Sequence, residues 1–106
     1  MYQLTFYVPK SHLESVKTAL FKAGAGHIGD YEHCAWQTLG TGQFRPLSAS
    51  RPFIGEIEKL ETLDEYKVEM VCLATKIKPA LQALLAAHPY QTPAYSVLAM
   101  QTIEDF

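Results

Sequence analysis

The fold of this 106-residue chain is decided by residues 24–46, which read GAGHIGDYEHCAWQTLGTGQFRP. The segment contains five of the six glycines, two of the four histidines, one of the two cysteines and the only tryptophan. Because glycine has no side chain, it allows left-handed backbone and the close approach of another group. Glycines at this density therefore indicate tight turns around either a packed neighbour or a ligand.

The residues before this segment predict one strand and one helix. Apolar and polar residues alternate from Tyr2 to Val8, which is the pattern of a strand with one buried face. Ser11 and Glu14 have the spacing of a capping box, so we expect a helix from about His12. Gly24 is the expected left-handed end of that helix.

The residues after Gly24 predict further strands and a second helix. We expect a turn at Gly40–Gly42 because two glycines flank a single threonine there. The second helix begins with Thr75 as its N-cap and ends before Pro89. The strand-like segments are His33–Leu39, Gln43–Arg45, Phe53–Glu61, Tyr66–Leu73 and Ala94–Met100, with residues 101–106 as a tail.

This order of elements predicts an α+β fold in one domain, residues 1–106. Strand and helix alternate as in a ferredoxin-like split βαβ unit, here with an elaborated middle hairpin. Right-handed crossovers would place both helices on one face of an antiparallel sheet. Tyr7, Trp36 and Tyr95 would then lie on the opposite face, and a second subunit is the simplest cover for them.

Composition and charge exclude several classes of function. The net charge is −2 and the nine Lys and Arg residues form no run, which argues against broad nucleic-acid binding. No apolar run approaches the roughly 18 residues of a membrane span. The N-terminus has no signal-peptide pattern. Two cysteines are too few for a disulfide scaffold, so we expect a reduced, cytoplasmic setting.

Five short motifs resemble a known family. They are AGAGHIGDY, GTGQFRP, PFIG, KLE and AHPY, at residues 23–31, 40–46, 52–55, 59–61 and 87–90. In this order and spacing they resemble the domain inserted within long members of the Nif-three-like (YqfO-type) dinuclear-metal protein family. The resemblance implies a fold like that of the PII signalling and CutA proteins, which are trimers of ferredoxin-like units.

The same resemblance limits what can be expected of this segment. In the family, the paired metal ions are held by histidines and carboxylates of a flanking domain, so it implies no cofactor and no hydrolase or cyclohydrolase activity here. The family's acidic run after His-Pro-Tyr is replaced by Gln91-Thr92-Pro93. That departure argues against a metal or other cation at this corner.

The histidines and cysteines are candidate metal ligands. His27, His33, Cys34 and His88 are residue types that transition metals prefer, but their spacing matches no standard zinc motif. In a strand, neighbouring His33 and Cys34 would point to opposite faces. We therefore expect no bound metal and no catalytic residues, because no nucleophile, base and orienting group share a pattern.

We expect one ligand-binding site where three segments meet. If the ends of both helices lie at one edge of the sheet, the glycine loop, the middle hairpin and the end of the second helix converge there. Aromatic residues would form the walls, and a few polar groups would orient a small molecule. The predicted site residues are Gly26, His27, Tyr31, Thr41, Phe44, Arg45, His88 and Tyr90.

The expected function is a small homo-oligomeric binding, sensing or scaffolding module of PII/CutA type, with a trimer favoured, and not an enzyme. Anion binding by loop amides with Arg45 or Arg51 is a weaker expectation. Two alternatives stay open. One is a CutA-type metal-binding protein that uses His27, His33 or His88. The other is an accessory subunit of a metal-dependent hydrolase of the Nif-three-like family.

Overall fold

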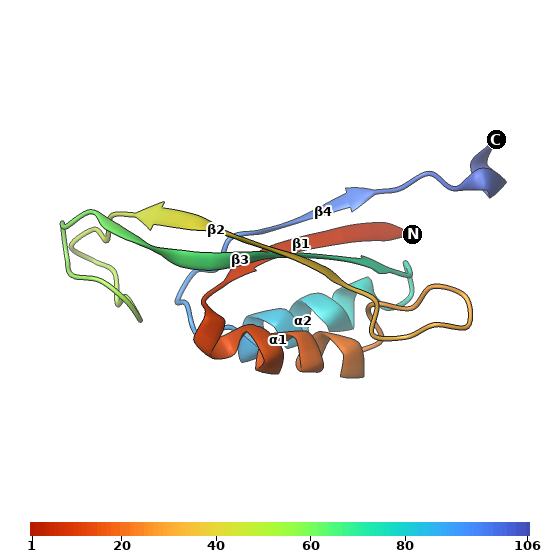
Figure 1. The fold of residues 1–106 in the computed structure, drawn as a ribbon, viewed down its shortest axis with the longest axis horizontal. Coiled ribbons are helices and arrows are strands. Elements are labelled where there is room, and N and C mark those ends of the chain that lie inside the picture. The colour runs from red at the N-terminus through yellow and green to blue at the C-terminus, as the bar shows by residue number, and fades with distance from the viewer.

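A computed structural model describes all of residues 1–106 and contains a four-stranded antiparallel sheet with both helices on one face (Figure 1). The strands lie in the order β2-β3-β1-β4. This is the predicted α+β, ferredoxin-like split βαβ fold, which is confirmed. The elements are β1 (Tyr2–Val8), α1 (Lys10–Lys22), β2 (Trp36–Phe44), β3 (Glu61–Cys72), α2 (Ile77–Ala87), β4 (Tyr95–Ala99) and the short 3-10 helix η1 (Ile103–Asp105).

The core lies between the sheet and the two helices. One face of β1 and β3 and the inner faces of α1 and α2 form a single buried cluster. Each fully buried Val, Leu or Phe side chain stabilises a fold by roughly 1.5–3 kcal/mol, so this cluster is the main source of stability. Its members are Leu4, Phe6, Val8, Leu13, Val16, Leu20, Ala25, Val68, Met70, Cys72, Ala80 and Leu84.

Both helix starts differ from the sequence-based expectation. α1 begins at Lys10 with Pro9 as its N-cap, and the Ser11 hydroxyl lies 2.8 Å from His12 Nδ1 instead of capping the backbone. α2 has Lys76 and not Thr75 as its N-cap, also without a side-chain cap. The capping predictions were wrong because Ser11 lies inside the first turn of α1, and Thr75 lies in the turn that Lys76 N closes on Leu73 O.

The middle hairpin is simpler than expected. β2 runs unbroken through Gly40 and Gly42, which pair with Glu65 and Leu63 of β3, so the predicted turn and the separate Gln43–Arg45 strand are wrong. A Cβ atom added at Gly42 would overlap the Glu65 carboxylate. This glycine therefore makes room for a cross-strand side chain and does not turn the chain.

Two predicted strand boundaries in the same region are also wrong. Residues 33–35 precede β2, and His33 has a φ of +59°, which is incompatible with a strand. Residues 53–58 form bends and turns in the loop between β2 and β3. Glu58 N donates to Pro46 O at 2.6 Å across that loop, and Glu58 itself has a φ of +61°.

The two ends of the sheet carry different loops (Figure 1). We call the end at Val8 the left end and the end at Tyr2 the right end, as they appear in the figure. β1 and β3 are antiparallel, and each is followed by a helix that returns along the sheet. The two helices are therefore antiparallel to one another, so α1 ends at the right and α2 at the left.

The face of the sheet opposite the helices is uncovered (Figure 1). Tyr7 and Trp36 lie on this open face as predicted, since Trp36 pairs with Glu69 and Glu69 with Thr5. Tyr95 does not, because it pairs with Phe6, whose side chain points into the core. No helix of the structure is long and apolar enough to cross a lipid bilayer.

The chain enters and leaves the sheet at the right end. β1 begins there and β4 ends there, and Met100 N donates to Met1 O at 3.0 Å. Beyond this bond the chain continues into η1, where Thr102 N donates to Asp105 Oδ2 at 2.6 Å.

Candidate functional site

The eight residues predicted to form one site are divided between the two ends of the sheet. Gly26 N donates to Val71 O at 2.8 Å, which fixes the glycine loop with His27 and Tyr31 at the right end. The remaining five lie toward the left end: Thr41, Phe44, Arg45, His88 and Tyr90. The predicted convergence is wrong, because antiparallel helices place their C-terminal ends at opposite ends of a sheet.

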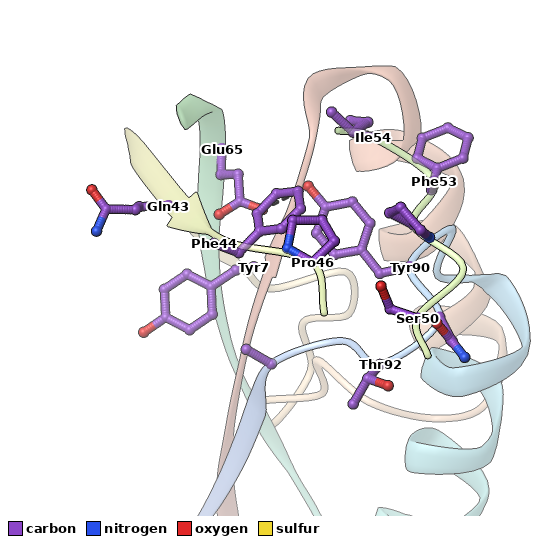
Figure 2. A pocket seen from close by; sticks show the side chains of 13 residues that line it. Tyr7, Gln43, Phe44, Pro46, Ser50, Phe53, Ile54, Glu65, Tyr90 and Thr92 are labelled. Atoms are coloured by element: carbon purple, nitrogen blue, oxygen red, sulfur yellow. Dashed lines mark hydrogen bonds between the residues drawn. The ribbon is translucent and has the colours of Figure 1, made fainter. Parts of the chain in front are cut away.

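The left end contains a pocket of about 290 Å³ (Figure 2). It lies between the end of the sheet, the β2–β3 loop and the segment that connects α2 to β4. Aromatic and proline side chains form most of its apolar wall: Phe44, Pro46, Pro52, Phe53 and Tyr90. The polar lining comes from hydroxyl and amide side chains and from a single charged residue, Glu65.

Tyr90 is at the centre of this pocket (Figure 2). Its hydroxyl donates to Glu65 Oε2 at 2.7 Å. Its ring centre lies 6.3 Å from that of Phe44 and 6.4 Å from that of Phe53, within the range of favourable aromatic contacts. Burial and the neighbouring carboxylate of Glu65 raise the pKa of Tyr90, so the phenol keeps its proton and Glu65 acts as the acceptor.

The His88 ring fixes the position of Tyr90 through hydrogen bonds to two backbone groups. Its side chain is 6% exposed, and its Nε2–H donates to Tyr7 O at 2.6 Å. Its Nδ1 accepts the Tyr90 N–H at 3.1 Å, so the partners require a neutral ring with the proton on Nε2. Burial lowers the pKa of His88, which agrees with this neutral form. Both ring nitrogens are used within the protein, as expected for a positioning residue.

Long-range contacts also fix the β2–β3 loop over the pocket. Arg51 N donates to Gln91 Oε1 at 2.7 Å, which ties this loop to the segment after α2. The Phe53 ring meets His12 of α1 edge-on, with 5.3 Å between ring centres. The loop therefore rests on two other elements, and the walls of the pocket are formed before any ligand arrives.

The sequence did not indicate several of the pocket residues. Glu65 looks like any polar position in an alternating strand, and only the cross-strand space at Gly42 shows why its carboxylate reaches Tyr90. Phe53 was assigned to a strand. Thr41 and Arg45 are exposed and outside the lining, so Phe44 and Tyr90 are the two predicted site residues that the pocket unites.

The right-end loop has a different construction. Residues 28–31 form a tight turn in which Ile28 and Tyr31 exchange two backbone hydrogen bonds of 2.9 Å. Gly26 and Gly29 have φ values of +79° and +57°. A Cβ at Gly26 would lie 2.9 Å from the Phe21 ring and 3.0 Å from Cys34 O. These glycines serve the shape of the loop.

The candidate metal ligands do not form a cluster. His27 Nε2 and His33 Nε2 lie 3.8 and 3.9 Å from the two carboxylate oxygens of Glu32, all on exposed side chains. The His33 ring stacks on Phe21 at 4.7 Å, and His88 is at the other end of the sheet. No three His, Cys, Asp or Glu side chains lie close enough together to share an ion.

Comparison with known proteins finds longer relatives that contain a segment similar to this chain. No family model matches it. A Mycobacterium leprae protein named GTP cyclohydrolase 1 type 2 homolog is 47% identical over 94 residues, which are 89% of this chain and 24% of that protein. The Bacillus subtilis protein of the same name is 42% identical over 99 residues, 93% of this chain and 26% of that protein.

The solved structure of a NIF3-related protein contains a segment with the same fold as this chain. The Bacillus cereus protein related to NIF3 superposes with a TM-score of 0.82 at 35% identity, over 95% of this chain and 26% of that one. Over nearly its whole length, the chain is therefore homologous to one segment of the NIF3-related proteins. It spans about a quarter of the length of these NIF3-related proteins, so the cyclohydrolase name describes the longer relatives.

The NIF3-related segment also shares its fold with small proteins. CutA1 from Pyrococcus horikoshii matches with a TM-score of 0.70 at 15% identity, over 97% of this chain and 86% of that one. The PII-like protein CutA from Nostoc matches with a TM-score of 0.67 at 13% identity, over 94% and 81%. At these identities the likeness shows the fold alone, which is the expected PII/CutA-like one.

Three of the five motifs that indicated the NIF3-related family meet at the pocket. Phe44 comes from GTGQFRP, Phe53 and Ile54 come from PFIG, and Tyr90 comes from AHPY. The AGAGHIGDY motif lies at the right end of the sheet. The motifs of this chain thus lie at two separate ends of the sheet.

Proposed function

We propose that this chain is a homo-oligomeric PII/CutA-like binding module whose small-molecule ligand occupies the left-end pocket. The observation that carries the proposal is the pocket itself, with a volume of about 290 Å³, aromatic walls and few polar groups. Small-molecule sites are mostly apolar, preformed clefts of about 300–1,000 Å³ with a few convergent polar groups. The left-end pocket is at the small end of this range and fits a ligand of one or two rings.

Phe44 and Tyr90 remain the two predicted residues assigned to binding, now with Glu65 and Phe53. The ligand would pack against the three aromatic rings and take its polar contacts from Glu65 and the neighbouring amides and hydroxyls. The predicted roles of His27 and Tyr31 in the same site are withdrawn because they lie at the right end.

A fragment screen followed by ¹⁵N NMR would test this proposal. We expect compounds that bind wild type to shift resonances of residues 44, 53 and 90, and to lose binding in Phe44→Ala. Tyr31→Ala is the matched control, since Tyr31 is an aromatic side chain that is 74% exposed at the right end. Binding that maps to the glycine loop, or that survives Phe44→Ala, would contradict the assignment.

The proposed oligomer, with a trimer favoured, is supported by the open sheet face. Trp36 and Leu98 are 69% and 61% exposed on the two edge strands of this face, and a second subunit would cover these apolar side chains. Sedimentation at micromolar concentration should show a species larger than the 11.9 kDa monomer, reduced in mass by Trp36→Lys. A monomer would contradict it.

The second candidate function is that of an accessory subunit of a metal-dependent hydrolase. The greater length of the relatives favours it. This chain corresponds to about a quarter of proteins whose name denotes a cyclohydrolase homologue. In that case the pocket would regulate a site held by the remaining three quarters. Copurification with such a partner, tested with an affinity-tagged chain, separates the two candidates.

A further inference from the structure

The charge of the left-end pocket restricts its ligand more than its shape does. Of the thirteen residues that line it, Glu65 is the only one with a charged side chain, and none is Lys or Arg. Arg45 and Arg51 belong to the loop above the pocket, but their exposed side chains are outside the lining. The pocket therefore has one negatively charged group among aromatic, hydroxyl and amide side chains.

Two contacts fix the Glu65 carboxylate. Its Oε2 accepts the Tyr90 hydroxyl at 2.7 Å, and its Oε1 occupies the space over Gly42 that a side chain would otherwise fill. The Tyr90 bond neutralises no charge, because the phenol remains protonated. Neither contact is an ion pair, so the negative charge of Glu65 stays available to a ligand.

Lys67, the basic residue of β3, pairs with Glu69 and not with Glu65. Lys67 lies two residues further along the same face of β3, and its Nζ is 3.6 Å from Glu69 Oε1. His88, behind Tyr90, donates one proton to Tyr7 O and accepts another from the backbone, so it is neutral. Glu65 forms no ion pair in the structure, and the basic side chain that packs on the pocket wall, His12, contacts Phe53.

The aromatic walls favour the same kind of ligand. The negative faces of aromatic rings attract a cation within about 6 Å of the ring centre. Phe44 and Phe53 lie on two sides of Tyr90, with their rings tilted by 49° and 45° to it (Figure 2). A cationic group beside Glu65 would meet the carboxylate and lie next to the Tyr90 ring, which Phe44 and Phe53 flank, whereas the carboxylate would repel an anion.

We propose that the left-end pocket selects a small organic cation with a flat apolar body, an aromatic amine or amidine, over neutral and anionic molecules of the same shape. This inference rests on the proposed function and adds the charge of the ligand. It reverses the two sequence-based expectations for this corner. The carboxylate comes from β3 and not from residues 91–93, and Arg45 and Arg51 do not line the site.

The test compares benzamidine, benzamide and benzoate, which share a ring and differ in charge at pH 7. Each is titrated into the full chain and followed by ¹⁵N NMR at residues 44, 53 and 90. We expect benzamidine to bind at least tenfold more tightly than either of the others. In Glu65→Gln, which keeps an oxygen acceptor for Tyr90, this advantage should fall below threefold.

Asp64→Asn is the matched control. It removes the same charge from the adjacent residue, which lies on the opposite face of β3 and pairs with Thr41. The benzamidine advantage should persist in this variant, and unfolding curves of both variants check that the fold is intact. An advantage retained in Glu65→Gln, or lost equally in Asp64→Asn, would overturn the role of Glu65.

The outcomes also separate this inference from the proposed function. If all three compounds bind in the pocket with similar affinity, or if benzoate binds best, the cation proposal is wrong and the binding module stands. If none of the three shifts the pocket resonances, the cation proposal is again wrong. The unbiased fragment screen then decides independently whether the pocket binds any small molecule.

Discussion

The two ends of the sheet are built on different principles. At the left end, side chains bridge long stretches of sequence: His88 bonds to Tyr7 across 81 positions, and Tyr90 to Glu65 across 25. At the right end, the glycine loop is held mainly by backbone bonds between near neighbours, such as those of the 28–31 turn. A local pattern can therefore reveal the right-end loop, whereas the left-end pocket exists only in the folded chain.

The largest effect should come from His88→Ala. The change deprives Tyr7 O and Tyr90 N of their partners, and unpaired buried groups cost about 1–3 kcal/mol each. We expect the free energy of unfolding to fall by roughly 3 kcal/mol in urea denaturation. His27→Ala, an exposed histidine at the right end, should change it by less than about 0.5 kcal/mol. Equal effects would remove the distinction between the two ends.

Gly42→Ala should rank second. Its Cβ would overlap the Glu65 carboxylate, so this side chain must turn away and release the Tyr90 hydroxyl; a hydrogen bond to a charged group is worth about 1.5–3 kcal/mol. The control is Gly40→Ala in the same strand, where a Cβ would meet nothing within 4 Å. Thermal unfolding should separate the two variants clearly. If Gly42→Ala is as stable as Gly40→Ala, Glu65 is not confined as described.

The stability of the left end should also depend on pH. Burial lowers the pKa of His88 below its ordinary value of 6.5, with smaller opposing influences from the hydrogen bond to Tyr7 O and from Glu65. The unfolded chain therefore binds the proton first as pH falls. The contribution of neutral His88 to the stability of the fold is fully present above pH 6.5. Below pH 6.5 the free energy of unfolding falls by at most about 1.4 kcal/mol per pH unit.

Urea denaturation at several pH values between 7 and 5 measures this slope. Carboxylates contribute to it too, so the informative quantity is the difference from His88→Gln, which should lack the histidine contribution. His27→Gln should keep the wild-type slope. A His88→Gln variant with an unchanged slope would show that His88 titrates normally in the folded chain.

The smallest effect should come from Gly29→Ala at the right end. Gly29 has a φ of +57° with nothing near its missing side chain, so only backbone strain opposes the change. We expect a loss of about 1 kcal/mol in the free energy of unfolding. Ligand binding at the left end should be unaffected, which NMR titration can check. An unchanged stability would mean that the turn accepts ordinary backbone.

The sequence revealed the fold wherever periodicity was clear. Alternation predicted β1 and the part of β3 from Tyr66 onward, and the apolar stripes predicted both helices. The β2–β3 hairpin was missed because Gly42 reads as a turn residue when its cross-strand neighbour is unknown. The capping predictions failed at Ser11 and Thr75 because Ser11 lies inside the first turn of α1 and Thr75 lies in the turn before α2.

The candidate site was harder to predict than the fold. Phe44 and Tyr90 were found through motifs, but Glu65 has no local signal that separates it from the other polar residues of its strand. The single-site hypothesis failed on one geometric point, the direction of the second helix relative to the first. Once β3 is antiparallel to β1, no arrangement of side chains can bring His27 to His88.

The bond between Met100 N and Met1 O holds the start of β1 and the residue after β4 side by side. Because these two points are adjacent, a domain of this fold can be inserted into a surface loop of a larger polypeptide without separating the ends of that loop. The left-end pocket then lies at the opposite end of the sheet from the insertion point. A polypeptide joined at the right end therefore need not contact the pocket.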